Sequence, residues 1–194
     1  MAGRPRKFDR EQAIDRFLQL FWQNGFADTS IDDLQSAAGI QRGSFYAAFK
    51  DKETSYLLSL ERYADQFAEQ AKAAMYSQTS PRAGLAAFFR FAGDFLANNT
   101  GRGCFLLSSI ATNPPLNAAN MQFFERITQA LRGPLQQTCE RVKTMGELTD
   151  KETAHSLGAY ALTQVLGLNA LTRSGANPKT IRAVAQLAAA NMQN

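Results

Sequence analysis

The sequence predicts an all-α protein of about nine helices. Apolar residues recur every three or four positions along most of the 194-residue chain, which is the period of an amphipathic helix. Residues that cap helices precede most of these segments. No segment alternates apolar and polar residues as a half-buried strand does. We therefore expect three short helices in the first 50 residues and longer helices after them.

Capping residues and a glycine bound the first four helices. Asp9 is placed to cap the first helix, and Thr29 and Ser30 offer caps for the second. Gly39 should end that second helix, because glycine adopts a left-handed conformation at little cost. Asp51 can cap the fourth helix, which is long enough to join two domains. The four predicted ranges are 9–24, 30–38, 41–49 and 51–76.

Prolines mark the later helices. Ser80-Pro81 and Asn177-Pro178 each combine a cap with a first-turn proline. Gly133-Pro134 should kink the seventh helix, because proline removes an intrahelical hydrogen bond, and a bent helix can open a cavity beside it. Thr149 and Glu152 have the spacing of a capping box. The five predicted ranges are 81–98, 104–110, 116–142, 150–172 and 178–192.

Composition indicates a globular protein with two domains. The chain is 45% apolar, contains 14 Phe and has only 20% charged residues, which argues against a disordered chain. The short helices suggest one domain over residues 1–50. The longer ones suggest a second domain over 51–194, whose first helix, 51–76, links the two.

Several classes of protein are disfavoured by what the sequence lacks. It has no apolar run long enough for a membrane span and no signal peptide, so we expect a cytoplasmic protein without a membrane partner. Cys104, Cys139 and the single His, His155, do not have metal-ligand spacing, and we expect free thiols, no metal site and no cofactor. No phosphate loop or nucleophile elbow is present, and we expect no enzyme.

Residues 30–49 have the features of a helix-turn-helix. Two short helices flank a turn at Gly39, and Leu34, Phe45 and their neighbours can pack the helices together. The second helix then presents small, polar or cationic residues on one face, which suits the major groove of DNA. The net charge of +4 and a basic arm with Arg4, Arg6, Lys7 and Arg10 agree with a polyanionic partner.

These residues resemble the signature of the TetR family of bacterial regulators. The matching segments are Thr29-Ser30-Ile31, Ala37-Ala38-Gly39-Ile40, Gly43-Ser44-Phe45-Tyr46, Phe49 and Lys52-Glu53. The sequence departs from the family at Gln35, at Ala47-Ala48 and at Lys50-Asp51, so a relative's operator sequence cannot be assumed for this protein.

The resemblance implies a role for individual residues of the module. It places Thr29 or Ser30, Tyr46 and Lys52 at DNA phosphates, which hydroxyls and a point charge suit. It places Gln41, Arg42 and Ser44 nearest to the base edges, where an arginine can bond a guanine bidentately. Gly43 keeps that face small, and Lys50 adds a charge. The complete predicted DNA-binding set is Thr29, Ser30, Gln41, Arg42, Gly43, Ser44, Tyr46, Lys50 and Lys52.

A homodimer is expected, because one module alone covers little DNA. Small residues recur along the last two predicted helices, and the resemblance implies that these helices form a four-helix bundle with a second subunit. The alternative is that they only cover the core of their own domain. The predicted interface comprises Gly158, Ala161, Val165, Ile181, Val184, Ala185 and Ala188.

The resemblance further implies a ligand-responsive regulator, most often a repressor that an unknown small-molecule effector releases from a palindromic operator. The predicted effector pocket comprises Phe88, Phe91, Phe95, Cys104, Phe105, Phe124, Leu131 and Tyr160. Cys104 resembles a cysteine of family members that sense electrophiles or oxidants, and a helix start would lower its pKa. Two alternatives therefore remain: a redox or electrophile sensor acting through Cys104, and a helical interaction protein with a degenerate DNA-binding module.

Overall fold

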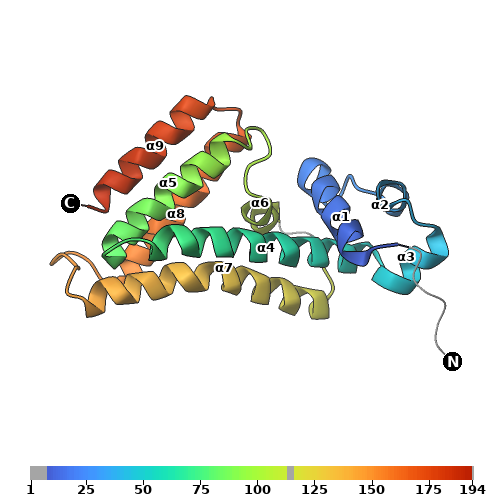
Figure 1. Cartoon of the computed structure of the whole chain (residues 1–194), viewed down its shortest axis with the longest axis horizontal. Helices are drawn as coiled ribbons and strands as arrows, with labels where there is room; N and C mark the ends of the chain where they lie inside the picture. Colours follow the sequence, from blue (N-terminus) through green and yellow to red (C-terminus); the bar gives the residue numbers. More distant parts are fainter. Residues whose placement is uncertain (1–7, 113–115, 194) are drawn as a thin grey trace.

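All regular secondary structure in residues 8–112 and 116–193, the part that the computed structural model describes, is helical, and this confirms the predicted fold class (Figure 1). The elements in this part are α1 (Arg10–Asn24), α2 (Ile31–Ala38), α3 (Arg42–Phe49), α4 (Lys52–Tyr76), α5 (Pro81–Ala97), α6 (Phe105–Thr112), α7 (Ala118–Thr144), α8 (Ala154–Arg173) and α9 (Pro178–Asn191). The basic arm before Phe8 and the segment 113–115 lie outside the described residues.

Helices α1, α2 and α3 form a small module at one end of the molecule (Figure 1). Its core is aromatic: the Phe17 ring meets the rings of Phe45 and Phe49 edge-on, at centroid distances of 6.0 and 4.8 Å. All three side chains are fully buried. Edge-to-face pairs of this kind add to the stabilisation that burial of the apolar rings provides.

The longer helices make up the other end. Helix α4 runs beside α7, and α5 packs extensively on α9 (Figure 1). The α5–α9 contact is close because Gly93 has no side chain: a Cβ at this position would stand 2.3 Å from the Cβ of Ala185. Small residues thus allow two helix backbones to approach one another.

Helix α4 joins the two ends. It contacts α1 of the small module and α5 and α7 of the larger end. The Arg62 guanidinium on α4 donates to the Asp15 carboxylate on α1 at 2.9 and 3.2 Å. Buried residues of the small module and of the larger end belong to one connected core. A movement of α4 would therefore be transmitted to α1.

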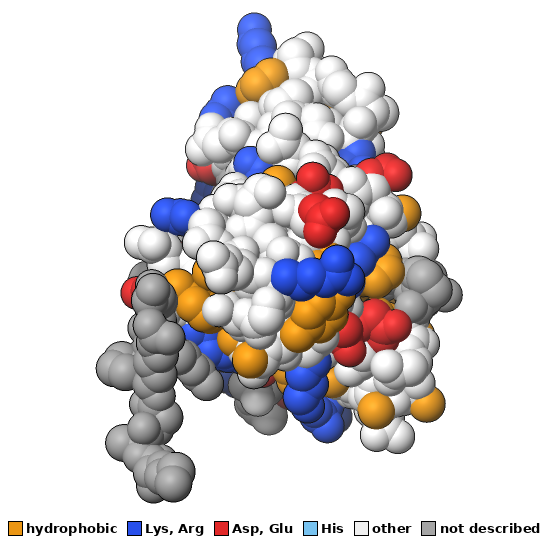
Figure 2. All heavy atoms as spheres, turned by 90° about the vertical axis from the view of Figure 1, so that its right-hand side faces the viewer, with side chains coloured by type: hydrophobic (Ala, Val, Ile, Leu, Met, Phe, Trp, Pro, Cys, Tyr) orange, Lys and Arg blue, Asp and Glu red, His pale blue; other side chains and the backbone are white. Residues whose placement is uncertain are grey.

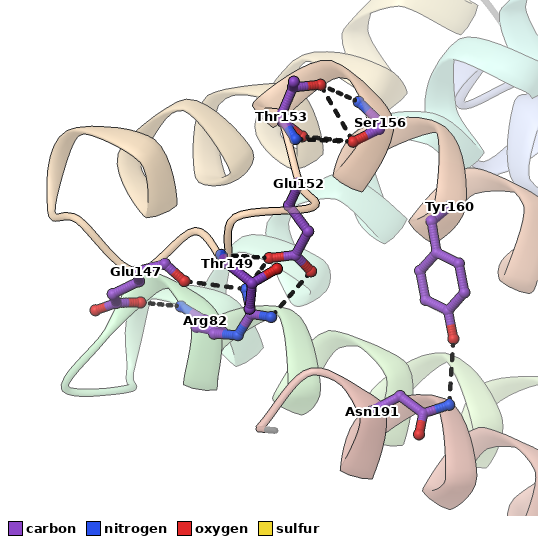
Figure 3. Close-up of polar contacts among 8 residues, drawn as sticks. All are labelled: Arg82, Glu147, Thr149, Glu152, Thr153, Ser156, Tyr160 and Asn191. Atoms are coloured by element: carbon purple, nitrogen blue, oxygen red, sulfur yellow. Dashed lines mark hydrogen bonds and ion pairs between the residues drawn. The ribbon is translucent and has the colours of Figure 1, made fainter.

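Two details of the later helices differ from the sequence expectations. Helix α8 begins at Ala154 with a capping box of Thr153 and Ser156, not of Thr149 and Glu152. Glu152 still accepts from the backbone N–H of Thr149 at 3.0 Å, which is one half of the predicted box. Its two carboxylate oxygens also pair with Arg82 at the start of α5, at 3.0 Å each (Figure 3). This second partner could not be foreseen from local spacing, because Arg82 is distant in the sequence.

Helix α7 continues through Pro134 from Ala118 to Thr144. The kink expected at this point stays a prediction. The predicted consequence, a cavity beside this part of the helix, is present, because Pro134 and Leu135 both line one.

Candidate functional site

Helices α2 and α3 form the predicted helix-turn-helix. Ser30 caps α2, and its hydroxyl accepts from the backbone N–H of Asp33 at 3.1 Å. Gly39 follows α2 with φ 65° and ψ 35°, the left-handed conformation that the turn requires. Leu34 of α2 and Phe45 of α3 are both fully buried in the core of the module. The turn and the packing together hold α3 rigidly on the surface.

One face of α3 is open to solvent. Gln41, Arg42, Gly43 and Ser44 are exposed, and Tyr46 is 40% exposed. Gln41 precedes the helix without forming a side-chain cap, so the first N–H groups of α3 are available to a phosphate. The Arg42 guanidinium lies 5.7 Å from the centre of the Tyr46 ring. This face is small and cationic, as the sequence predicted.

Thr29 was predicted to contact a phosphate, and its side chain cannot do so in this conformation. It is fully buried, and its hydroxyl donates to the carbonyl of Gly25 at 2.7 Å. The sequence could not separate Thr29 from Ser30, because either residue could cap α2. Ser30 is the cap and is exposed, although its hydroxyl also donates to the Asp33 carboxylate at 2.7 Å. That contact lowers the pKa of Asp33.

The two predicted lysines differ in how firmly they are held. Lys50 is exposed and has a φ of 64°, which turns the chain between α3 and α4. Lys52 is half-buried: its Nζ lies 4.4 Å from the centre of the Phe26 ring and donates to the carbonyl of Ala27 at 3.3 Å. Lys52 thus carries a fixed charge beside the loop before α2.

Positive charge is not uniform on this end of the molecule. Figure 2 shows Lys and Arg side chains spread across it together with several Asp and Glu side chains. Arg16, which the sequence interpretation omitted, is bonded to the carbonyl of Ala37 at 2.9 Å and holds α2 against α1. Recognition of DNA by this surface would depend on particular residues rather than on a broad basic patch.

A small apolar cavity lies between α4, α5, α7 and α8. Its volume is about 40 Å³. Roughly 10 to 15 Å³ of such space admits one water molecule, so it is far smaller than the 300 to 1,000 Å³ of typical ligand pockets. A ligand could enter only if the surrounding side chains moved. The lining residues are Phe67, Ala68, Ala71, Met75, Phe88, Cys104, Leu107, Arg132, Pro134, Leu135, Leu162 and Val165.

Among the predicted pocket residues whose side chains the structure describes, only Phe88 and Cys104 line this cavity. Phe91 and Phe95 pack on Phe67 at centroid distances of 5.4 and 5.2 Å. The side chain of Leu131 lies outside the described residues.

The other three predicted residues lie elsewhere. Phe105 meets the ring of Tyr56 edge-on at 5.7 Å. Phe124 lines a separate open groove. Tyr160 accepts from Asn191 of α9 at 3.4 Å (Figure 3). Helical periodicity identified apolar faces but could not show which neighbour each face meets.

Cys104 does not have the lowered pKa that its predicted helix-start position suggested. It is 2% exposed, and burial raises the pKa of its thiol, although the neighbouring Tyr63 side chain opposes this rise. Cys139 is also a free, buried thiol, and burial raises its pKa to about 11. A protonated, enclosed thiol is a poor nucleophile.

The predicted dimer residues mostly face inward. Ala161, Val165, Ile181, Ala185 and Ala188 are buried against their own chain. Gly158 and Val184 are half-buried. These residues allow the helices of one subunit to pack closely, and their place in an interface between subunits stays a prediction. Different side chains of α8 and α9 face outward, including Leu166, 39% exposed, and Leu187, 67% exposed.

Within the described ranges, no group of three or more His, Cys, Asp and Glu residues could hold a metal ion. Among the helices of the same ranges, none has both the length and the hydropathy to cross a bilayer.

This arrangement is that of a helix-turn-helix DNA-binding protein with a separate regulatory region. Residues 14–54 match the family described as bacterial regulatory proteins, tetR family. The chain is 30% identical over 186 residues to the HTH-type transcriptional repressor ComR of Escherichia coli K12, covering 94% of this chain and 88% of ComR. The chain belongs to the TetR family and is a ligand-responsive transcriptional regulator.

Solved structures have the same fold. A cysteine-substituted CifR bound to 26-bp double-stranded operator DNA superposes with a TM-score of 0.78, at 25% identity, over 97% of this chain and 98% of CifR. FadR of Bacillus subtilis in complex with stearoyl-CoA superposes with a TM-score of 0.74, at 15% identity, over 95% of this chain and 97% of FadR.

Proposed function

We propose that this protein is a repressor that binds a palindromic operator as a homodimer and is released when a small molecule enters its regulatory region. The exposed face of α3 carries the proposal: Arg42, Gly43, Ser44 and Tyr46 project from a rigid helix whose opposite face is buried. The operator complex of CifR and the repressor ComR support it.

Arg42 is the residue that we assign to base recognition. Its guanidinium is exposed and can bond one guanine bidentately. Tyr46 lies next to it and would meet the phosphate backbone. Replacement of Arg42 by Ala should cost about 1 to 3 kcal/mol mainly at one base pair, whereas Tyr46→Ala should weaken binding to every sequence.

A fluorescence anisotropy titration with promoter fragments, repeated at several salt concentrations, tests this function. The log-log slope of affinity against salt should be several units, because Lys and Arg displace condensed cations. Lys143→Ala on α7 is the matched control, since Lys143 is exposed but lies outside the module, and it should bind as the wild type does. Failure to bind any duplex even at low salt would favour the interaction-protein alternative.

The dimer is proposed to form through the outward faces of α8 and α9. The two faces adjoin, since Tyr160 of α8 meets Asn191 of α9 (Figure 3). Leu187 lies one turn before Asn191, and Leu166 and Leu187 are exposed apolar side chains of these two helices. An exposed apolar patch of this kind is typical of a protein interface.

Leu187→Glu should therefore yield monomers in sedimentation velocity. Met145 is a comparable exposed apolar residue, at 57% exposure, but it lies after α7. Met145→Glu should leave the dimer intact. A dimer that survived Leu187→Glu unchanged would place the interface elsewhere.

The loop between α5 and α6 is the proposed connection between the cavity and the DNA-binding module. Cys104 lines the cavity. The Trp22 indole of α1 donates to the carbonyl of Gly103 at 3.0 Å, and Arg102 lies 4.0 Å from the centre of the Trp22 ring. The Arg102 guanidinium also donates to Gln19 at 3.0 Å. A shift of this loop would turn α1 and change the position of α3.

A hundredfold loss of operator affinity requires about 3 kcal/mol of differential effector binding between the two states. Trp22→Phe, which removes the bond to Gly103, should reduce this coupling without abolishing operator binding. The redox alternative has less support, because the Cys104 thiol is buried and protonated. Cys104→Ser should keep the response to the effector.

A further inference from the structure

We propose that the effector is an amphipathic carboxylate, with its apolar body in the cavity between α4, α5, α7 and α8 and its carboxylate on Arg132. This inference rests on the proposed function and specifies the ligand of the same site. Arg132 is the one charged residue among the described residues that line the cavity.

The inside of the cavity selects an apolar group. Phe67, Met75, Phe88 and Leu135 are buried around it. Thr138, a buried polar residue near Met75, already donates its hydroxyl to the carbonyl of Pro134 at 2.8 Å. A polar ligand group placed among these side chains would lose its hydrogen bonds to water without replacement. The apolar part of the ligand must therefore point inward.

Arg132 lies at the boundary between the cavity and the solvent. It is exposed, and it also lines the open groove along the outside of α7, where Phe124, Gln129 and Arg126 are further lining residues. No ion pair of Arg132 occurs within the described part of the chain. Its guanidinium is thus available to a ligand that enters from the groove. The planar guanidinium can bind a carboxylate through two parallel N–H···O hydrogen bonds.

The groove also fixes where the anionic group can lie. Glu125 is the carboxylate that lines it, and it stands seven residues before Arg132 on the same helix. At about 1.5 Å per residue the two positions are about 10 Å apart along the helix axis. Arg126 lies 5.2 Å from the centre of the Phe123 ring, and its charge acts on Glu61 of α4, whose pKa it helps to lower against the effect of burial. The position beside Arg132 is therefore the favourable one for an anion.

The size of the ligand follows from the cavity. Its volume of about 40 Å³ admits only a few water-sized groups until side chains move. Met75 on one wall is unbranched and flexible, so it can give way to a chain or a ring. We expect compact alkyl or aromatic carboxylates to bind. Enlargement of the cavity would push on Cys104 and on the loop that contacts Trp22.

Isothermal titration calorimetry of the full-length protein without DNA tests the ligand class. The probes are octanoate and 2-naphthoate, which are ionised at neutral pH, with 1-octanol and octylamine as neutral and cationic counterparts. At least one carboxylate should bind, and octanol and octylamine should bind at least about tenfold more weakly, as expected for loss of a charge-assisted hydrogen bond. Equal affinity for octanoate and octanol, or no binding of either carboxylate, would overturn the proposal.

Variants identify the site. Arg132→Gln should weaken binding of the carboxylate about 10- to 100-fold and leave octanol unchanged. Arg141→Gln is the matched control, because Arg141 is an exposed arginine of α7 that lines neither cavity nor groove. Ala68→Leu should fill the cavity and weaken every probe. Unchanged carboxylate binding in Arg132→Gln, or unchanged binding in Ala68→Leu, would contradict the assignment.

The operator titration distinguishes failure of the proposed function from failure of the proposed ligand class. If the ligand-free wild type did not bind operator DNA, the proposed function would be refuted, whereas the calorimetry tests ligand binding without DNA. A protein that binds its operator and ignores every carboxylate would refute the ligand class alone.

Discussion

The pairing of Arg82 with Glu152 should contribute measurably to stability, and replacing Glu152 with Gln tests its magnitude. The two side chains are only 13% and 22% exposed and are joined by contacts of 3.0 Å (Figure 3). The backbone N–H of Arg82 also donates to Glu147 at 2.9 Å, and its guanidinium donates to the Glu147 carbonyl at 3.2 Å. The pair therefore fastens the start of α5 to the segment between α7 and α8.

The pKa of Glu152 gives the magnitude. Hydrogen bonds from Arg82 lower it from 4.5 to about 2, against the opposing effect of burial. At about 1.4 kcal/mol per tenfold change in proton affinity, this lowering of the pKa sets an upper limit of about 3.5 kcal/mol on the contribution of the pair to stability. Water reaches part of the carboxylate and screens the pair, so we expect Glu152→Gln to lower the unfolding free energy by about 2 kcal/mol at pH 7.

The pH dependence provides the sharper check. Because the folded-state pKa is lowered, the stabilisation is complete above about pH 4.5 and is lost as the pH falls toward about 2. Urea unfolding at one fixed protein concentration should show the wild type and Glu152→Gln converging below about pH 4.5.

Asp94→Asn is the matched control. Its ion pair with Arg182 is equally short, at 2.9 Å, but the two side chains are 64% and 44% exposed. Exposed pairs contribute about 0.2 to 1 kcal/mol. If Glu152→Gln cost no more than Asp94→Asn, or if its cost stayed constant down to about pH 3, the reasoning about the Arg82 pair would be refuted.

Three further outcomes are expected. Gly93→Ala should destabilise the protein by about 1 to 3 kcal/mol in urea unfolding, because its Cβ would stand 2.3 Å from that of Ala185. Gly158→Ala is the control: a Cβ there would make only an ordinary contact, so the unfolding free energy should rise by about 0.5 to 1 kcal/mol. Equal effects of the two substitutions would contradict the close α5–α9 packing. Cys104 should react with Ellman's reagent at least about a hundredfold more slowly in the native protein than in denaturant, because its thiol is buried and its pKa is raised; rapid native labelling would restore the redox alternative. Gly39→Ala should cost about 1 kcal/mol, measured by thermal unfolding, since φ is 65° there; no change in melting temperature would contradict the turn geometry.

Much of the small module could be predicted from its sequence, because the signals there are local. Ser30 and Gly39 bound α2 through hydrogen bonds and backbone conformation that involve near neighbours in the chain. The exposed and buried faces of α3 follow from helical spacing within eight residues. The sequence could not decide between Thr29 and Ser30, because adjacent hydroxyl residues have the same capping chemistry and only the packed structure shows that Thr29 is the buried one.

The regulatory region was predicted less well, because its site is made by contacts between distant segments. Phe91, Phe105 and Tyr160 lie on helices that were correctly expected, but each side chain meets a neighbour other than the cavity. Arg132 was not recognised, since an arginine on a helix surface has no local feature that distinguishes a binding residue from a solvated one.

By itself, the sequence determined that this chain is all-helical, where most of its helices lie, and that residues 30–49 form a helix-turn-helix, because these properties depend on periodicity and capping between near neighbours. The tertiary structure alone decided that Arg82 pairs with Glu152, that Ala185 packs on Gly93 within one subunit, and that Cys104 is enclosed beside the cavity. Such contacts depend on how whole helices pack against one another, and no short stretch of sequence specifies that arrangement.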